Sequence, residues 1–270
     1  MKDKICRIMQ AVKEKRPLIH CITNPISITQ CANTVLSAGG RPIMAEHPEE
    51  APEITSSAQA LMLNLGNITD ARRESMKLSA KTAAENNVPF ILDVCGAACL
   101  SSRREYALSL TELAVPSVIK GNYSEIMALY SNVHRASGVD ADPTLRLEAL
   151  ELAAAELARK LGTVVLASGG TDIVTDGRRI THIKNGTPQL STITGTGCMQ
   201  GALCAAYLSA ADAFSAAVSA CAVFGICGQL AETDKGSGSF FIGLHDALST
   251  VGASEVQKYT DLEEKEIEEV

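Results

Sequence analysis

Short apolar runs alternate with longer amphipathic stretches along most of this chain. The runs that we expect to be strands cover 18–23, 41–45, 60–65, 88–94, 116–120 and 163–168. Between them, apolar residues recur at helical spacing, as at Ile28, Cys31 and Val35, and Gly39 and Gly40 stop that helix. Strands that alternate with helices predict an α/β fold of three layers, with helices on both faces of a mostly parallel sheet.

The second half of the chain adds three features. A long helix is expected over about 144–161, and DIVTDGRRITHI predicts an antiparallel hairpin that turns at Asp176-Gly177. LSTIT at 190–194 is interpreted as a further strand, after which the chain turns helical to about 231. The stretch 202–231 is apolar, but it is rich in alanine and interrupted by Asp212, which favours two buried helices over a membrane span.

Composition narrows the class of protein. The 270 residues are 46% hydrophobic, enough for one domain over 1–270 with a large core. The net charge of −7 argues against a nucleic-acid partner. Nine cysteines without a CxxC pair argue against zinc ribbons and thioredoxin chemistry, and free thiols suit the cytoplasm. The first 16 residues lack the apolar core of a signal peptide.

Polar residues and glycines follow the predicted strands. Ligands of parallel sheets bind beyond the carboxyl ends of the strands. The residues at those ends include Asn24, Met44, Asn64, Asp93, Lys120 and Ser168. Any one of them is explained equally well as an ordinary turn residue, but the set together predicts a ligand site at one edge of the sheet.

The strongest local signal is ITGTGCMQGALCAAY, in which Gly195 and Gly197 bracket Thr196 just before a long helix. Backbone N–H groups at such a helix N-terminus bind anions, and a transferring phosphoryl group fits there. The alternative is a tight turn that needs glycine. Cys198 falls in the first helical turn, where a thiol favours its charged form and can accept or orient a proton of a substrate alcohol. The alternative for Cys198 is a small buried hydrophobe.

KGNYSEI contains an Asn122-x-x-Glu125 pair at a strand-to-helix junction. The Glu125 carboxylate, together with Asp93 from the neighbouring strand end, is a candidate to hold Mg²⁺ through waters, because magnesium needs few carboxylates. Glu125 is equally well explained as a first-turn acid that the helix dipole favours, and the residues leave both readings open. The sequence contains no P-loop, dinucleotide-binding glycine motif or Gly-x-Ser-x-Gly elbow.

Five segments in order, IHCITNPISITQCANTVLSAGGRPIMAE, LNLGNITDAR, IKGNYSEI, TGTGC and ETDKGSGSF, resemble the hydroxyethylthiazole kinase family. The likeness runs from about 17 to 251, and the CITNP and PIMA segments are its most specific parts. It implies a ribokinase-like fold and transfer of phosphate from ATP, with Mg²⁺, to the hydroxyl of 4-methyl-5-(2-hydroxyethyl)thiazole in thiamine salvage or biosynthesis. It also implies a cytoplasmic homotrimer with active sites between subunits.

The resemblance assigns roles to individual residues. Cys198 matches the catalytic position, where the wider superfamily usually carries aspartate. The other matches are the anion-hole residues Gly195 and Gly197, the thiazole-contacting residues Asn24, Met44 and Gly195, the candidate ATP-binding residues Lys120, Asn122 and Ser168, and the magnesium-linked acids Asp93 and Glu125.

This chain departs from the family pattern at three places. It has Asp-Val-Cys-Gly at 93–96 where the family commonly has Asp-Pro-Val-Gly. Lys120 stands where the family usually has arginine, and it supplies a cation without the planar two-pronged grip. Ser168 stands where threonine is usual and keeps the hydroxyl. We expect these changes to alter nucleotide affinity without abolishing activity.

Two other functions fit part of the pattern. One is a related small-alcohol kinase, such as a hydroxymethylpyrimidine kinase, which the CITNP and PIMA segments argue against. The other is a non-catalytic thiazole-binding protein, which the retained Asp93, Glu125 and TGTGC argue against.

Overall fold

A single large sheet runs through the protein, here a computed structural model that describes residues 1–134 and 146–267. Its strands are β1 Leu18–Ile22, β2 Arg41–Ile43, β3 Ala60–Asn64, β4 Phe90–Asp93, β5 Val118–Asn122, β6 Val164–Ser168, β7 Asp172–Thr175, β8 Arg179–Ile183 and β9 Leu262–Glu266. Within the described residues the nine strands have the order β2-β1-β3-β4-β5-β6-β7-β8-β9. Neighbours from β2 to β6 pair in parallel, whereas β7, β8 and β9 pair antiparallel. The mostly parallel sheet is therefore confirmed.

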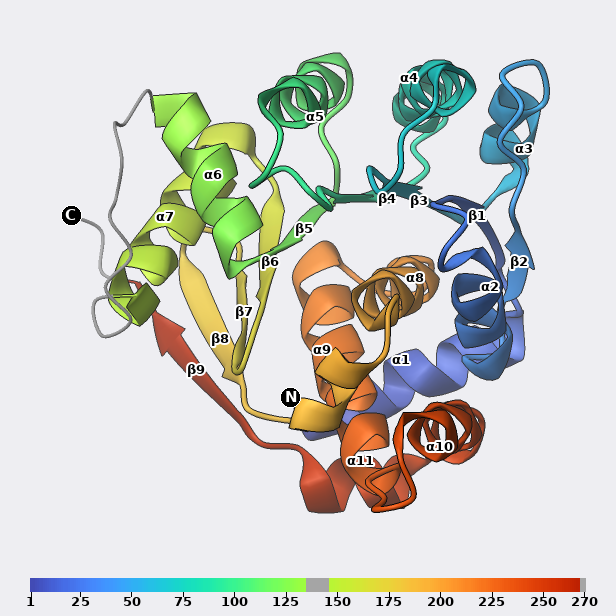
Figure 1. Cartoon of the computed structure of the whole chain (residues 1–270), viewed down its shortest axis with the longest axis vertical. Helices are drawn as coiled ribbons and strands as arrows, with labels where there is room; N and C mark the ends of the chain where they lie inside the picture. Colours follow the sequence, from blue (N-terminus) through green and yellow to red (C-terminus); the bar gives the residue numbers. More distant parts are fainter. Residues whose placement is uncertain (135–145, 268–270) are drawn as a thin grey trace.

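Helices cover both faces of the sheet (Figure 1). Their bounds are α1 Lys2–Lys15, α2 Ile28–Ser37, α3 Ala51–Ser57, α4 Asp70–Glu85, α5 Ser101–Leu113, α6 Tyr123–His134, α7 Arg146–Leu161, α8 Thr196–Leu208, α9 Ala213–Leu230, α10 Ser237–Thr250 and α11 Ala253–Tyr259. The helices α3 to α7 lie on one face, and α1, α2, α8 and α9 lie on the other. This arrangement confirms the predicted three-layer fold.

Side chains of the parallel strands point alternately into two separate cores. In β3, Met62 packs into the core on the α8 side, while Leu61 and Leu63 pack into the core on the α4 side. All three are fully buried. Burial on both faces explains why these strands are continuous apolar runs and do not alternate with polar residues.

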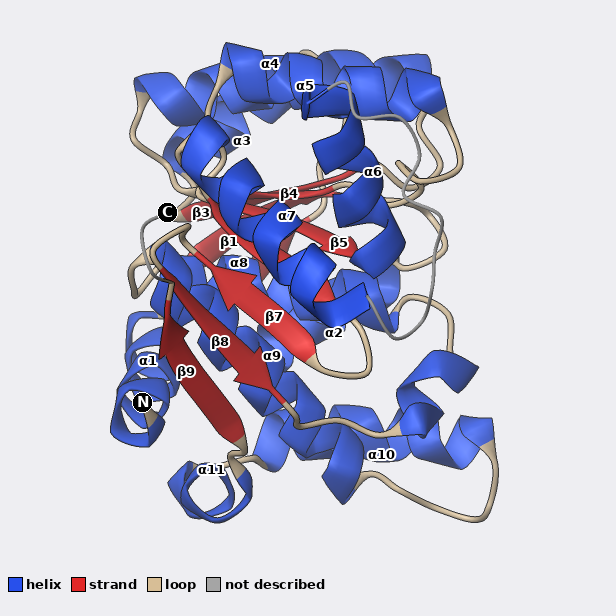
Figure 2. Cartoon of the chain, turned by 90° about the vertical axis from the view of Figure 1, so that its left-hand side faces the viewer, coloured by secondary structure: helices blue, strands red, loops and turns tan. Residues whose placement is uncertain are grey.

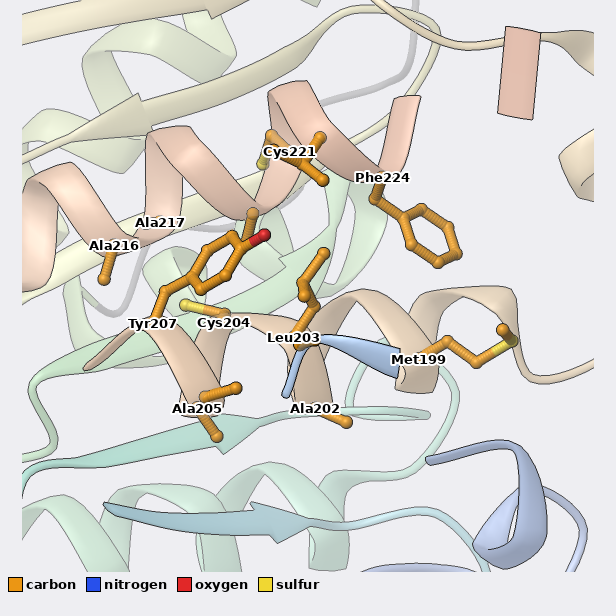
Figure 3. Packing of buried hydrophobic residues seen from close by; sticks show 14 of the residues in the cluster. Met199, Ala202, Leu203, Cys204, Ala205, Tyr207, Ala216, Ala217, Cys221 and Phe224 are labelled. Atoms are coloured by element: carbon orange, nitrogen blue, oxygen red, sulfur yellow. The ribbon is translucent and has the colours of Figure 1, made fainter. Parts of the chain in front are cut away.

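The apolar stretch near residue 215 is a core helix. Figure 3 shows Leu203, Cys204 and Tyr207 of α8 lying between α8 and α9, while Ala202 and Ala205 point toward the sheet. The helix α9 is long and apolar enough to cross a membrane by length and composition alone, but 83% of it is buried inside the fold. The prediction of two buried helices is therefore confirmed.

The structure corrects the sequence prediction at LSTIT. The strand expected at 190–194 is replaced by a 3₁₀ helix, η1 Pro188–Thr192, and α8 follows it without an intervening strand. The Thr187 hydroxyl accepts a hydrogen bond from the Gln189 N–H, and Pro188 stands at the first helical position, where proline is favoured. These two local signals outweigh the β-branched residues of this segment.

The ends of other predicted elements also differ in detail. The hairpin of β7 and β8 is confirmed, and β9 adds an edge strand to it (Figure 2). The side chains of 263–266 are solvent-exposed, as expected for the acidic tail, although their backbone pairs with β8. The helix predicted from 144 is described from Arg146, so its first two predicted positions lie outside the described residues.

Candidate functional site

The parallel strands bring the predicted residues to one edge of the sheet, where α8 begins. Asn24 follows β1, Asn64 ends β3, Asp93 ends β4 and Lys120 lies near the end of β5. The helix α8 packs against β1, β3 and β4, so its first turn lies over these strand ends. The predicted gathering of polar residues at one edge of the sheet therefore agrees with the fold.

The Cys198 sulfur is held by two amide side chains. The Nδ2 atoms of Asn24 and Asn64 each donate to Sγ over 3.4 Å, and Asn24 Nδ2 also donates to Asn64 Oδ1 over 3.0 Å. Cys198 is the third residue of α8 and is 9% exposed. The thiol therefore belongs to the buried core on the α8 side, and it accepts two amide hydrogen bonds there.

The N-terminus of α8 presents unpaired amides. Gly195 is the N-cap residue with φ of 90°, a conformation that glycine adopts without strain, and its carbonyl accepts from the Met199 N–H. The N–H groups of Thr196, Gly197 and Cys198 have no acceptor among the described residues. Three free amides at the positive end of a helix dipole have the chemistry that binding an anion requires.

A buried ion pair lies beneath this helix turn. Lys120 Nζ is 3.1 Å from Asp93 Oδ2, and the two side chains are 4% and 3% exposed. Burial by itself lowers the pKa of Lys120, but attraction to the Asp93 carboxylate and its hydrogen bond outweigh this effect and raise the pKa above its ordinary value. A Cβ atom on Gly197 would lie 3.5 Å from Nζ. A fixed cation therefore lies next to the free amides of α8.

Glu125 and Asn122 cap the start of α6. Glu125 Oε2 accepts from the Asn122 N–H over 2.7 Å, and Asn122 Oδ1 accepts from the Glu125 N–H over 2.9 Å. Glu125 Oε1 accepts from the Gly96 N–H over 2.7 Å and so holds the loop after β4, where Gly96 has φ of 79°. Glu125 therefore caps the first turn of α6. It also holds the loop at 93–96, where this chain has Asp-Val-Cys-Gly.

This capping role leaves room for a water-mediated metal. Each oxygen of Glu125 accepts one backbone hydrogen bond, and a carboxylate oxygen has two acceptor positions. The remaining positions, with the Asp93 carboxylate, fit a Mg²⁺ ion that keeps its own waters. Among residues 1–134 and 146–267, no three histidine, cysteine or acidic side chains cluster as direct metal ligands.

A cavity of about 570 Å³ adjoins the N-terminus of α8. Its walls come from the β6–β7 turn, the segment before η1, the first turns of α8 and the middle of α9. Residues that line it include Ser168, Gly169, Asp172, Asn185, Thr196, Gly197, Gln200 and Phe224. Ser168 therefore shares one cavity with Thr196 and Gly197, whereas Cys198 is not among the described residues that line it.

Sequence reasoning missed the pair that braces this cavity. Asp172 Oδ2 accepts from Gln200 Nε2 over 2.6 Å, and Asp172 Oδ1 accepts from the Gly169 N–H over 3.0 Å. Burial raises the pKa of Asp172, and the hydrogen bonds from Gly169 and Gln200 oppose that rise. The spacing of Gln200 three residues after Gly197 places both on one helix face, which is the signal that was available.

Met44 lies farther from this group than Asn24 does. It directly follows β2, the edge strand beside β1, and its half-buried side chain packs against the core on the α8 side. The next residue is tied down, because His20 Nε2 lies 2.9 Å from the Ala45 carbonyl oxygen. The structure thus places Met44 at the same edge of the sheet, without a polar contact to Cys198 among the described residues.

Comparison with known proteins agrees with the family resemblance seen in the sequence. A profile of the Hydroxyethylthiazole kinase family matches residues 9–254. A protein of Clostridium botulinum strain Hall named hydroxyethylthiazole kinase 2 is 45% identical over 91% of this chain and 94% of that protein. A hydroxyethylthiazole kinase of the Eklund 17B strain is 40% identical over 95% of both chains.

Solved structures agree in fold. The hydroxyethylthiazole kinase protein of Pyrococcus horikoshii superposes with a TM-score of 0.90 at 33% identity, over 98% of this chain and 100% of that one. The pyridoxal kinase of Staphylococcus aureus in complex with AMP-PCP and pyridoxal superposes with a TM-score of 0.66 at 15% identity, over 93% and 99%. The second likeness concerns the fold alone, which is shared with a ribokinase-like enzyme.

Proposed function

Because this chain belongs to the hydroxyethylthiazole kinase family, we propose that its phosphoryl-transfer site is the edge of the sheet where α8 begins. The chain is an ATP-dependent kinase of the hydroxyl group of hydroxyethylthiazole, and its reaction belongs to thiamine salvage. The main support for this location of the phosphoryl-transfer site is the set of free N–H groups at Thr196, Gly197 and Cys198. These groups lie beside the Lys120 cation and the 570 Å³ cavity.

The proposed reaction is an in-line displacement. The hydroxyl oxygen bonds to the γ-phosphorus, the bond from that phosphorus to the β-phosphate oxygen breaks, and ADP leaves with the electron pair. The free amides of α8 stabilise charge on the travelling phosphoryl group. The alcohol proton passes to the Cys198 sulfur, or Cys198 orients the hydroxyl until the proton leaves late in a loose transition state.

The two substrates occupy opposite sides of the α8 turn in this proposal. ATP fills the cavity, where Ser168 and Gly197 are wall residues. Asn122 ends β5 and pairs with Ser168, and Lys120 Nζ lies next to Gly197. The thiazole lies on the side of Asn24, Met44 and Gly195. The geometry supports this division because Asn24 contacts Cys198, whereas Ser168 lines the cavity.

Magnesium completes the proposed site. Asp93 and Glu125 would hold it through waters, at the lone pairs that their protein contacts leave available. The ion would neutralise charge on the β- and γ-phosphates when bound.

We further propose a cytoplasmic homotrimer of single-domain subunits with active sites between them. Ile26, beside Asn24, is 61% exposed, and Ile242 on α10 is 64% exposed. The helix α10, which contains Ile242, packs against α2, which begins two residues after Ile26. Exposed large apolar side chains of this kind favour a subunit contact. All nine cysteines are free thiols, which suits a reducing compartment.

An ADP-release assay with hydroxyethylthiazole, with and without Mg²⁺, tests the proposal. We expect Mg²⁺-dependent turnover that Cys198→Ala lowers much more than it lowers thiazole affinity. The same assay with hydroxymethylpyrimidine tests the rival kinase. Unchanged turnover in Cys198→Ala would refute the catalytic role of the thiol, and tight thiazole binding without ADP release would favour a binding protein.

A further inference from the structure

Asn64 is a fully buried residue at the end of β3 that the proposed reaction does not yet use. Its carbonyl oxygen Oδ1 accepts from the Gly66 N–H over 2.9 Å and from Asn24 Nδ2 over 3.0 Å. Because a backbone N–H occupies Oδ1, the orientation of the amide is determined, and Nδ2 must face the opposite way. Its contact there is Cys198 Sγ, at 3.4 Å.

Asn24 is oriented in the same manner. Its Oδ1 accepts from the backbone N–H groups of Ile26 and Ser27 over 3.1 and 3.2 Å. The two hydrogens of its Nδ2 therefore go to Asn64 Oδ1 and Cys198 Sγ. The two amides form a connected unit whose donors face one sulfur atom.

Gly66 makes this unit possible. A Cβ atom at position 66 would lie 2.8 Å from Asn24 Nδ2 and 2.9 Å from Asn64 Oδ1. A side chain at this position would push the two amides away from each other. The loop after β3 is thus built around the amide pair, which argues that the pair is more than a filler of space.

The hydrogen bonds around the sulfur have one direction. Both hydrogen bonds that the described residues make with Sγ are donations from amide N–H groups, and neither amide accepts the thiol hydrogen through these bonds. A neutral thiol is a weak acceptor, whereas a thiolate accepts strongly, so two donors are complementary to the charged form.

Other charged and titratable groups surround this sulfur. Lys120 of β5 interacts electrostatically with it, and the Asp93 carboxylate of β4 is paired with that lysine. Cys31 of α2 and Cys95 of the loop after β4 also interact electrostatically with it, and burial raises the pKa of each of these thiols to about 12. Both neighbours therefore stay neutral near pH 7 and place no negative charge beside Cys198.

We propose that Asn64 and Asn24 are positioning residues whose amide N–H groups hold the Cys198 sulfur in place to accept the proton of the substrate alcohol. The inference deepens the proposed function and rests on it for the identity of the proton donor. As the oxygen–phosphorus bond forms and ADP departs, the alcohol proton moves to Sγ. The resulting thiol returns the proton to solvent after the product leaves, so the enzyme is regenerated without an oxidant or reductant.

The test is the variant Asn64→Asp in the full chain. Its carboxylate keeps an oxygen to accept from Gly66 and Asn24, but it turns the group facing Sγ from a donor into a negative acceptor. The control is Asn87→Asp, the same chemical change on an exposed residue at the opposite end of the sheet, with φ of 55° that aspartate tolerates. Asn64→Ala, which removes the donor without adding charge, is the second variant if Asn64→Asp does not fold.

Two measurements are made on each protein. The first is ultraviolet thiolate absorbance against pH, taken as the difference from the matching protein that also carries Cys198→Ser, without nucleotide or metal. The second is the pH profile of kcat. We expect the thiolate midpoint and the acidic limb of kcat to move to higher pH together by about one unit in Asn64→Asp. Asn64→Ala should move them less, and Asn87→Asp should leave them in place.

An unmoved thiolate midpoint in Asn64→Asp and Asn64→Ala, with an unchanged pH profile, overturns the inference, even if both variants lose stability. The two levels of the proposal fail in different ways. If the wild-type chain releases no ADP with the thiazole, the proposed site or substrate fails. If the wild-type chain releases ADP but the thiolate midpoint of Cys198 does not change in the Asn64 variants, only the proposed role of the amide pair fails.

Discussion

Asp93→Asn removes the charge partner of a buried lysine. Asp93 Oδ2 and Lys120 Nζ are 3.1 Å apart, with side chains 3% and 4% exposed. At this separation and an effective dielectric constant near 20, the attraction amounts to about 5 kcal/mol. Breaking a buried pair costs about 3–5 kcal/mol because the remaining charge has neither water nor a partner. We therefore expect Asp93→Asn to lower the free energy of unfolding by about 3–5 kcal/mol.

Urea unfolding of four proteins separates the charge effect from the role in activity. They are the wild type, Asp93→Asn, Lys120→Met and the double variant. Because replacing both members of a buried pair with neutral groups is often close to neutral, the double variant should recover to within about 2 kcal/mol of the wild type. It should nevertheless release no ADP, since the cation beside Gly197 is gone.

Two results would contradict this reasoning. A loss below about 1 kcal/mol in Asp93→Asn would mean that water or another group compensates Lys120. A double variant no more stable than the single variants would mean that the residues act through packing and not through their opposite charges.

Two further predictions concern stability and the cavity wall. Burial lowers the pKa of His20 below 6.5 despite its hydrogen bond to Ala45. The unfolded chain therefore binds a proton at His20 more readily than the folded chain does. The contribution of His20 to the free energy of unfolding is complete above pH 6.5 and is lost as the pH falls through the lowered pKa. In His20→Gln, the urea midpoint should therefore fall less steeply with decreasing pH below 6.5 than in the wild type. Some pH dependence should remain because burial also lowers the pKa of His245. An unchanged slope of the urea midpoint against pH would contradict the reasoning. Gly169→Ala places a Cβ 2.3 Å from Tyr123 Cζ, so it should cost about 1–3 kcal/mol and raise the KM for ATP. Gly170→Ala, whose Cβ meets nothing within 4 Å, is the control for the unfolding free energy, and equal losses in the two variants would refute the steric argument.

Local sequence determined most of the architecture. Apolar runs buried on both faces identified the parallel strands, and Asp176-Gly177 identified the hairpin. The glycines of TGTGC predicted a helix N-terminus, and α8 begins there with Cys198 in its first turn. These features were readable because their causes lie within a few neighbouring residues. The resemblance then supplied the family, which the comparisons confirm.

Contacts between residues far apart in the sequence could not be predicted in this way. Asn64 and Cys198 are 134 residues apart, and Lys120 and Asp93 are 27 apart, so no local pattern shows that they touch. The same holds for Asp172 and Gln200, which meet only because α8 packs beside the β6–β7 turn. At LSTIT, even a local prediction was wrong, because a proline and a threonine cap favoured a 3₁₀ turn over a strand.

The sequence alone therefore determined which segments form strands and helices and which strand ends carry polar groups, since hydrophobic period and turn chemistry are local properties. Only the tertiary structure decided which of those groups pair. The strand order β2-β1-β3-β4-β5 and the seating of α8 set the distances between them, and hydrogen bonds and ion pairs depend on distances of a few ångströms. The donors around Cys198 and the partner of Lys120 follow from that packing.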